Sequence, residues 1–258
     1  MKDEIIRLLG LRRDKILQDA KIPKAKFYDL EDFNAQKKKI FTNDVDEICL
    51  LAILNEETIN IAPLKNDEVN YSEVYVVYVS LKKDNNSSKI IDVIQKNIPN
   101  PTIVILSFKN KVLIATARKR LSRAEKNRQV TESEQSTPWL AIDDQPQPIQ
   151  SYLNGLNITN FSFQNLYNFY QEFSLYIYQS VLLPFSPDFK FAKALSIEAL
   201  EPTLADYLAK QAEIRSLTEE ESETLNFGDK IAIHQKLVKA QLALGGMTAV
   251  INNLLATK

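Results

Sequence analysis

The spacing of apolar residues changes part-way along this chain, and this change most constrains how the chain can fold. Between residues 45 and 117, apolar residues gather in short, dense segments of strand length. Beyond Gly155 they recur at every third or fourth position, as in an amphipathic helix. The sequence therefore predicts an α+β fold. An N-terminal antiparallel or mixed β-sheet with flanking helices is followed by a helical C-terminal part.

The first part has five segments with strand character. The segment at 73–81 is dense in β-branched and aromatic residues, which favour a pleated, half-buried surface. A helix is expected after Ser88, and residues 109–111 are expected to turn between the last two strands. The order β-β-β-α-β-β favours a sheet with helices on one face. The expected strands are residues 45–54, 58–62, 73–81, 102–108 and 112–117.

A polar stretch separates the two parts. Residues 129–150 are poor in aliphatic side chains and rich in Ser, Thr, Gln, Pro and Asp, which is typical of a loop or linker. Within it, the apolar island that begins at Trp139 is expected to dock on a neighbouring element, since exposing it would be costly. The predicted division is an α+β domain over 1–128, a linker over 129–150 and a helical region over 151–258.

The last predicted helix carries an apolar seam with alternating three- and four-residue spacing, which is typical of packing between two helices. It packs either within the chain, as a helical hairpin, or against another chain, and we favour the hairpin. The seam consists of Ile233, Leu237, Ala240, Leu244, Met247, Ile251 and Leu254.

Several residue types are too scarce for common catalytic sites. Cys49 is the only cysteine and His234 the only histidine, so an intrachain disulfide, a thiolate metal cluster and a two-histidine zinc helix are excluded. The five glycines form no phosphate-binding loop. We expect no cofactor, no metal ion and no catalytic constellation. The acidic N-terminus and the short apolar runs predict a cytoplasmic protein without a membrane segment.

One weak pattern leaves a metal-dependent nuclease as an alternative interpretation of the sequence. Such enzymes hold a metal with converging carboxylates beside a lysine. The chain approaches this pattern only at Asp188 with Lys190, in a proline-interrupted segment, and at Glu73 with Lys82, which are far apart.

The charge is divided unequally along the chain. Residues 1–130 carry 24 Lys and Arg against 18 Asp and Glu, whereas residues 131–258 carry 8 against 15. A basic tract follows the predicted turn at 109–111. We expect it to contact the phosphate backbone of DNA or RNA without sequence preference. A solvated surface, or a contact with the acidic half of the chain, would explain it equally. The tract consists of Lys109, Lys111, Arg118, Lys119, Arg120, Arg123, Lys126 and Arg128.

Short motifs are spread along most of the chain: KIPKAKFY at 21–28, QKKKIF at 36–41, VDEI at 45–48, Leu54, TINI at 58–61, IP at 98–99, ARK at 117–119, Trp139, Arg215, Leu217, Glu221 and LNF at 225–227. Together they resemble a bacterial and archaeal family, domain-of-unknown-function family 4391. The resemblance implies no known activity or site. Because members look like companions of helicase, methyltransferase and restriction-type genes, it implies an accessory role in defence against foreign DNA.

The sequence thus favours a non-catalytic accessory or adaptor protein of a DNA-processing or anti-phage defence assembly. In this interpretation the basic tract contacts nucleic acid or an acidic partner, and the C-terminal helices contact a protein. The alternatives are a nuclease with a dispersed metal site and a purely structural protein-interaction module.

Overall fold

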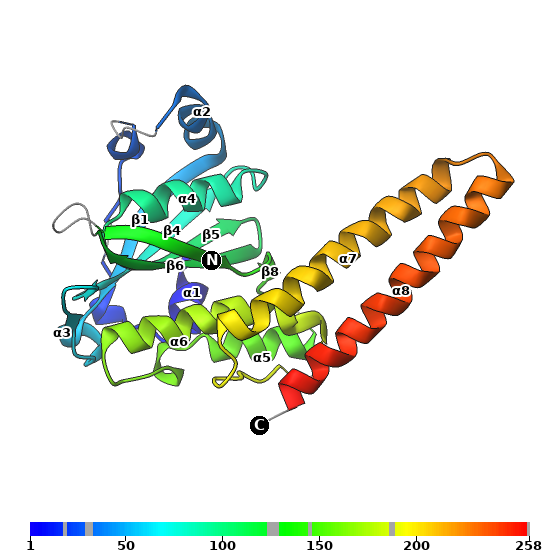
Figure 1. Cartoon of the computed structure of the whole chain (residues 1–258). Helices are drawn as coiled ribbons and strands as arrows, with labels where there is room; N and C mark the ends of the chain where they lie inside the picture. The colour runs from blue at the N-terminus through cyan, green and yellow to red at the C-terminus, as the bar shows by residue number, and fades with distance from the viewer. Residues whose placement is uncertain (18–19, 29–32, 123–128, 144–145, 186–188, 257–258) are drawn as a thin grey trace. The chain divides into compact units, whose positions relative to one another are not determined.

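The computed structural model describes residues 1–17, 20–28, 33–122, 129–143, 146–185 and 189–256. The chain divides into two compact units, Met1–Leu183 and Pro184–Lys258 (Figure 1). The helices of the first unit are α1 (Lys2–Leu8), α2 (Ala35–Asp44), α3 (Glu56–Ile59), α4 (Ser87–Asn97), α5 (Gln147–Gly155) and α6 (Leu166–Gln179). Its short 3-10 helices are η1 (Arg13–Lys15), η2 (Lys24–Phe27) and η3 (Ile158–Asn160), and η4 (Ser180–Phe185) follows α6.

A mixed six-stranded sheet forms the centre of the first unit, in the order β1-β4-β5-β6-β7, with β8 also paired to β6. Strands β4 and β5 are parallel and are joined by α4, whereas the other pairs of this sheet are antiparallel. The mixed sheet confirms the predicted fold class. Its strands are β1 (Val45–Leu54), β4 (Val74–Leu81), β5 (Thr102–Phe108), β6 (Lys111–Leu121), β7 (Gln129–Ser136) and β8 (Leu140–Ala141). A separate pair consists of β2 (Leu64–Lys65) and β3 (Asn70–Tyr71).

Helices α2 and α4 cover one face of this sheet (Figure 1). Ile90 and Ile94 of α4 are fully buried, and they pack with Val79 and Val104 of the central strands. This face holds the main apolar core of the unit. The apolar island that begins at Trp139 docks as expected, because β8 pairs with β6 and Trp139 packs against this core.

Helices α5 and α6 lie on the opposite face, so the expectation of helices on one face only is wrong (Figure 1). Phe169, Tyr170 and Phe173 of α6 are completely buried. The aromatic face of this helix is therefore part of the core, as its spacing indicates. Helix α6 and most of α5, which the sequence assigned to the helical C-terminal region, instead belong to the first unit, which ends at Leu183.

Residues 58–62 do not form the expected strand. Helix α3 begins after Asn55, whose side-chain oxygen accepts from the Thr58 amide at 3.0 Å. The Thr58 hydroxyl accepts in return from the Asn55 amide at 2.8 Å. This reciprocal capping box satisfies two backbone donors locally, and it outweighs the alternating pattern of the sequence.

The polar stretch at 129–150 is not a linker. Its first part forms strand β7, which pairs antiparallel with β6 along most of its length, and its last part begins α5. Strand β7 lies at the edge of the sheet, with Glu132, Glu134 and Ser136 exposed. An edge strand obtains its stability from the backbone ladder and tolerates polar side chains, so composition alone does not reveal it.

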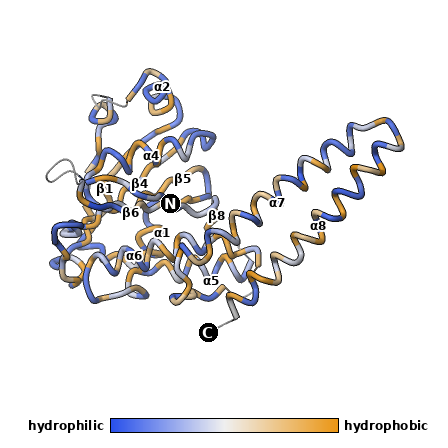
Figure 2. Tube along the Cα trace, in the orientation of Figure 1, coloured by the Kyte–Doolittle hydropathy of each residue, from blue (hydrophilic) through white to orange (hydrophobic). Residues whose placement is uncertain are grey.

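The second unit consists of two long helices, α7 (Ile197–Glu223) and α8 (Phe227–Ala256), packed side by side as a hairpin. The predicted seam faces inward, since Ile233, Leu237, Ala240 and Ile251 are buried. Figure 2 shows hydrophobic and hydrophilic residues alternating along both helices. The intrachain hairpin that we favoured is confirmed. Among the described residues, no helix combines the length and apolar character needed to cross a membrane.

Candidate functional site

The described residues of the basic tract lie at two ends of strand β6. Lys109 and Lys111 flank the turn between β5 and β6, and both side chains are exposed. Lys109 has a left-handed backbone, with φ of 52°, which closes this tight turn. The neighbouring Asn110 donates a hydrogen bond of 2.7 Å to the carboxylate of Asp143. This end of β6 therefore presents two lysines with one acidic side chain nearby.

The other end of β6 does not present all of its cations to solvent. Lys119 is only 3% exposed, and its ammonium donates to the backbone oxygens of Ile98 and Asn100, the latter at 2.8 Å. Ile98 is the C-terminal cap of α4, where a cation complements the helix dipole. Burial lowers the pKa of the Lys119 ammonium to about 7. Lys119 thus has a structural role in this fold rather than the surface role that we expected.

Two tyrosines explain how the β6 backbone is held at this point. The register of β5 with β6 ends at Val104 and Ala115. Beyond it, the Tyr170 hydroxyl accepts from the Ala117 amide at 2.9 Å and lies 2.9 Å from the Thr102 oxygen. A single hydroxyl therefore bridges the two strands where the direct ladder stops.

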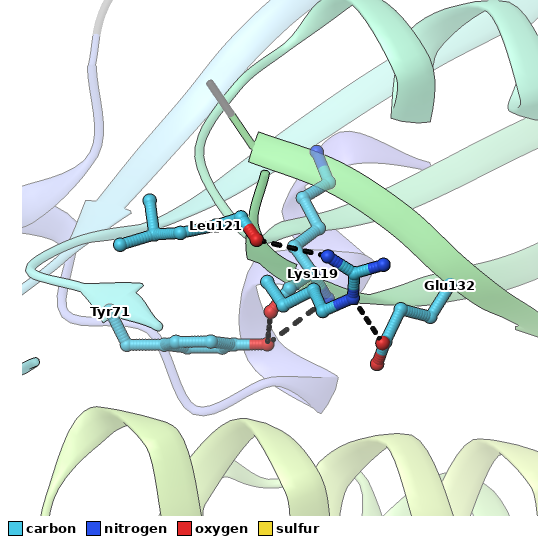
Figure 3. Close-up of polar contacts among 5 residues, drawn as sticks. Tyr71, Lys119, Leu121 and Glu132 are labelled. Atoms are coloured by element: carbon cyan, nitrogen blue, oxygen red, sulfur yellow. Dashed lines mark hydrogen bonds and ion pairs between the residues drawn. The ribbon is translucent and has the colours of Figure 1, made fainter. Parts of the chain in front are cut away.

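The Tyr71 hydroxyl makes a second contact of this kind. It accepts from the Lys119 amide at 3.3 Å and donates to the Lys119 carbonyl at 3.2 Å (Figure 3). The Lys119 side chain leaves the strand on the side away from Tyr71 (Figure 3). The pairing of β6 with β7 is also irregular between Arg118 and Lys119. Successive side chains of an extended strand point to opposite faces of the sheet, which explains why Lys119 is buried whereas Arg118 and Arg120, on either side of it, are half-buried.

Arg120 and Arg118 differ from Lys119 in exposure. The Arg120 guanidinium lies 2.7 Å from the Glu132 carboxylate on β7 and donates to the Leu121 carbonyl at 3.0 Å (Figure 3). Arg118 is half-buried. The positive charge of Arg120 is therefore matched within the sheet by an acidic side chain of the neighbouring strand.

The described members of the tract do not form one continuous strip. Lys109 and Lys111 lie at one end of β6, and Arg118 and Arg120 lie at the other. Arg118 lies seven positions after Lys111 along an extended strand, or roughly 23 Å away. Arg123, Lys126 and Arg128 lie outside the described residues.

The residues considered for metal chemistry do not assemble in the part of the chain that the structure describes. No group of three His, Cys, Asp or Glu side chains there could hold a metal ion. Asp188 lies outside that part. His234 is exposed on α8, and its Nδ1 lies 2.9 Å from the Glu221 carboxylate of α7.

A second polar cluster, which the sequence did not reveal, lies beside β1. The Glu47 carboxylate accepts from the ammonium groups of Lys2 and Lys21, each at 2.9 Å. Lys2 is also 3.3 Å from the Cys49 sulfur. Hydrogen bonds from Lys2 and then Lys21 lower the pKa of Glu47 to about 2. These contacts tie the N-terminal segment to the edge strand.

The helical hairpin exposes large apolar side chains. Leu225 is fully exposed and Phe227 is 78% exposed, at the turn between α7 and α8. Farther along α8, Ile231, Val238 and Leu242 are exposed at spacings of seven and four residues. These positions differ from the buried seam, so α8 carries apolar residues on a second face.

Together, these features define an α+β protein with a mixed sheet, a helical hairpin and no metal-binding cluster among the described residues. The family model described as Domain of unknown function (DUF4391) matches residues 14–244. The chain therefore belongs to this family, as the sequence motifs implied. No curated protein and no solved structure matches the chain.

Proposed function

We propose that this chain is a non-catalytic adaptor that binds a protein partner through its C-terminal helical hairpin. The observation that carries the proposal is the exposure of Leu225 and Phe227 at the hairpin turn. Burying a leucine or phenylalanine side chain is worth about 1.5–3 kcal/mol relative to leaving it exposed. Two such side chains at the turn of a two-helix hairpin are suitable anchors for a partner.

The charge around the turn defines the partner that we propose. Glu219, Glu220 and Glu223 are exposed on the last turns of α7, next to the two anchors. A partner with an apolar pocket and a basic rim would complement them. The exposed residues of α8, Ile231, Val238 and Leu242, would extend the contact beyond the turn.

The wider setting is part of the same proposal. The resemblance to companions of helicase, methyltransferase and restriction-type genes supports an assembly that processes DNA or acts in defence. This support is associational, because the family description carries no activity.

The test uses the tagged full chain, purified from the cells that encode it and compared with two variants by quantitative mass spectrometry. Leu225→Ser with Phe227→Ser should remove one or more stoichiometric partners, because both anchors are lost. Phe163→Ser, which changes another exposed phenylalanine far from the hairpin in sequence, should retain them. Identical partners for all three proteins would refute the adaptor role of the turn.

Nucleic-acid contact is the second candidate, and the exposed pair Lys109 and Lys111 favours it. Loss of two phosphate contacts would reduce the magnitude of the slope of log K against log salt concentration by about 2. Lys109→Glu with Lys111→Glu should therefore weaken binding to labelled DNA or RNA, and Lys89→Glu, an exposed site on α4, should not. Absence of binding by the unmodified chain at low salt would refute this candidate.

A further inference from the structure

A small apolar cavity lies beside the edge strand β1 in the first unit. Its volume is about 150 Å³. Strand β1 is the edge of the sheet, and Ile16 and Lys21 of the N-terminal segment bridge to it. The cavity lies where this segment, the end of β1 and the 3-10 helix η3 meet. Its apolar lining includes Leu11, Ile16, Ala52, Leu54, Ile61 and Ile158.

The wall formed by Gly10 depends on a close approach that other residues would prevent. Gly10 has φ of +64°, a conformation that side chains disfavour. A Cβ atom on Gly10 would lie 2.5 Å from the side-chain oxygen of Asn157, the residue that caps η3. The Ile158 amide also donates to the Leu9 carbonyl at 3.0 Å. The N-terminal segment and η3 are thus joined directly, and the cavity has defined walls.

Two of the polar side chains that line the cavity are cationic. Arg12 and Lys15 contribute to the lining, together with Thr58 and Thr159. The Arg12 guanidinium forms an ion pair with the Asp14 carboxylate, at a distance of 2.9 Å. Lys15 is half-buried and forms no ion pair with any residue that the structure describes. The two cations and Asp14 leave a net positive charge beside an apolar space.

We propose that this cavity binds a small apolar molecule that carries one carboxylate. A cavity of about 150 Å³ lined by aliphatic and aromatic residues holds a molecule about the size of benzene. The apolar part of the ligand would lie against Ile16, Ala52 and Leu54, and its carboxylate would contact Lys15 and Arg12. The exposed ring of Phe163, which also lines the cavity, would cover part of the ligand.

The test measures binding of three probes of equal chain length, hexanoate, hexan-1-ol and hexylamine, to the full chain by NMR titration. Hexanoate should bind in a saturable manner, with an affinity about tenfold higher than that of hexylamine. In the double variant Arg12→Gln and Lys15→Gln, hexanoate affinity should fall to that of hexanol, and hexanol affinity should not change. Both positions are at least partly exposed, so folding should be preserved.

Two further variants test the apolar part of the cavity. Ala52→Leu should fill the space and abolish binding of hexanoate and hexanol alike. Because Ala52 is buried and this change could unfold the chain, Phe163→Ala, at an exposed ring, provides a second test and should weaken both probes. Absence of saturable binding up to about 10 mM hexanoate would overturn the proposal. Equal binding of the three probes would overturn it as well.

Discussion

The ammonium of Lys119 on β6 donates a hydrogen bond of 2.8 Å to the carbonyl oxygen of Asn100, and a second bond to Ile98 at the end of α4. Both acceptors are neutral backbone groups. Burial is the cause that lowers the pKa of this ammonium to about 7. A buried charge with only dipolar partners costs stability, and losing its proton relieves that cost.

The buried lysine predicts a specific dependence of stability on pH. The pKa of Lys119 is about 7 in the folded chain, and the pKa of a lysine in an unfolded chain is about 10.4. Between these values the unfolded chain holds one more proton, so stability contributed by this site increases as the pH rises. Relative to Lys119→Met, the unfolding free energy of the unmodified chain should increase by about 1.4 kcal/mol per pH unit from about pH 7.5 to 9.5.

Urea unfolding across this pH range measures the effect. The control is Lys111→Met on the same strand, where the side chain is exposed. Parallel stability curves for the unmodified chain and Lys119→Met would show that Lys119 keeps its proton in the fold.

Removal of the Tyr170 hydroxyl should lower the stability of the chain while keeping the aromatic ring in the core. Tyr170→Phe removes the hydroxyl that accepts from the Ala117 amide and contacts the Thr102 oxygen. The Ala117 amide and the Thr102 oxygen are buried and would lose this hydrogen-bond partner. The substitution should therefore lower the free energy of unfolding by about 1–3 kcal/mol. Tyr167→Phe on the same helix is the matched control, and denaturant unfolding should show a smaller change there. Equal effects of the two substitutions would contradict the bridging role.

The ion pairs of Glu47 should make the stability of the chain depend on pH in the acid range. Because the Lys2 and Lys21 ammonium groups lower the pKa of this carboxyl to about 2, its stabilising effect is present above the unfolded pKa and lost as the pH falls toward 2. The stability advantage of the unmodified chain over Glu47→Gln should be about 1 kcal/mol near neutral pH, since the pair is partly exposed. It should disappear during acid titration followed by circular dichroism, whereas Glu57→Gln should have no such effect.

Alanine substitutions at two glycines should change the stability of the chain in opposite directions. A Cβ atom at Gly155 would lie 2.0 Å from the Tyr176 hydroxyl oxygen, which donates to the Tyr152 carbonyl at 2.7 Å. Gly155→Ala should therefore destabilise the first unit, by about 1–3 kcal/mol. Gly246 on α8 has open space around it, so Gly246→Ala should stabilise the helix by up to about 1 kcal/mol. Thermal unfolding of both variants tests the contrast.

The strands and helices that the sequence predicted well are those whose burial leaves a strong local pattern. Strand β4 was expected from its density of β-branched and aromatic residues, and helix α4 from the apolar face of its sequence. The seam of α8 was readable for the same reason. Strand β7 and helix α3 were missed, because pairing at a sheet edge and a capping box determine them rather than hydrophobic spacing.

The basic tract shows the same limit at the candidate site. Lys109 and Lys111 are exposed as the sequence suggested, but Lys119, in the same tract, is buried. Residue type and spacing predict charge, whereas the exposure of each lysine depends on what packs against β6, which for Lys119 is the C-terminal end of α4. No pattern in the residues near Lys119 indicates that two distant hydroxyls hold its strand.

The sequence by itself determined the α+β class, the helical hairpin and the unequal division of charge, because hydrophobic period and composition are local properties of the chain. The tertiary structure decided which helices cover the sheet, where the units divide and which lysines reach solvent. Those outcomes depend on contacts between residues far apart in sequence, such as Tyr170 with Ala117 and Lys119 with Asn100. The cavity beside β1 arises in the same way, since no single segment of the chain encloses it.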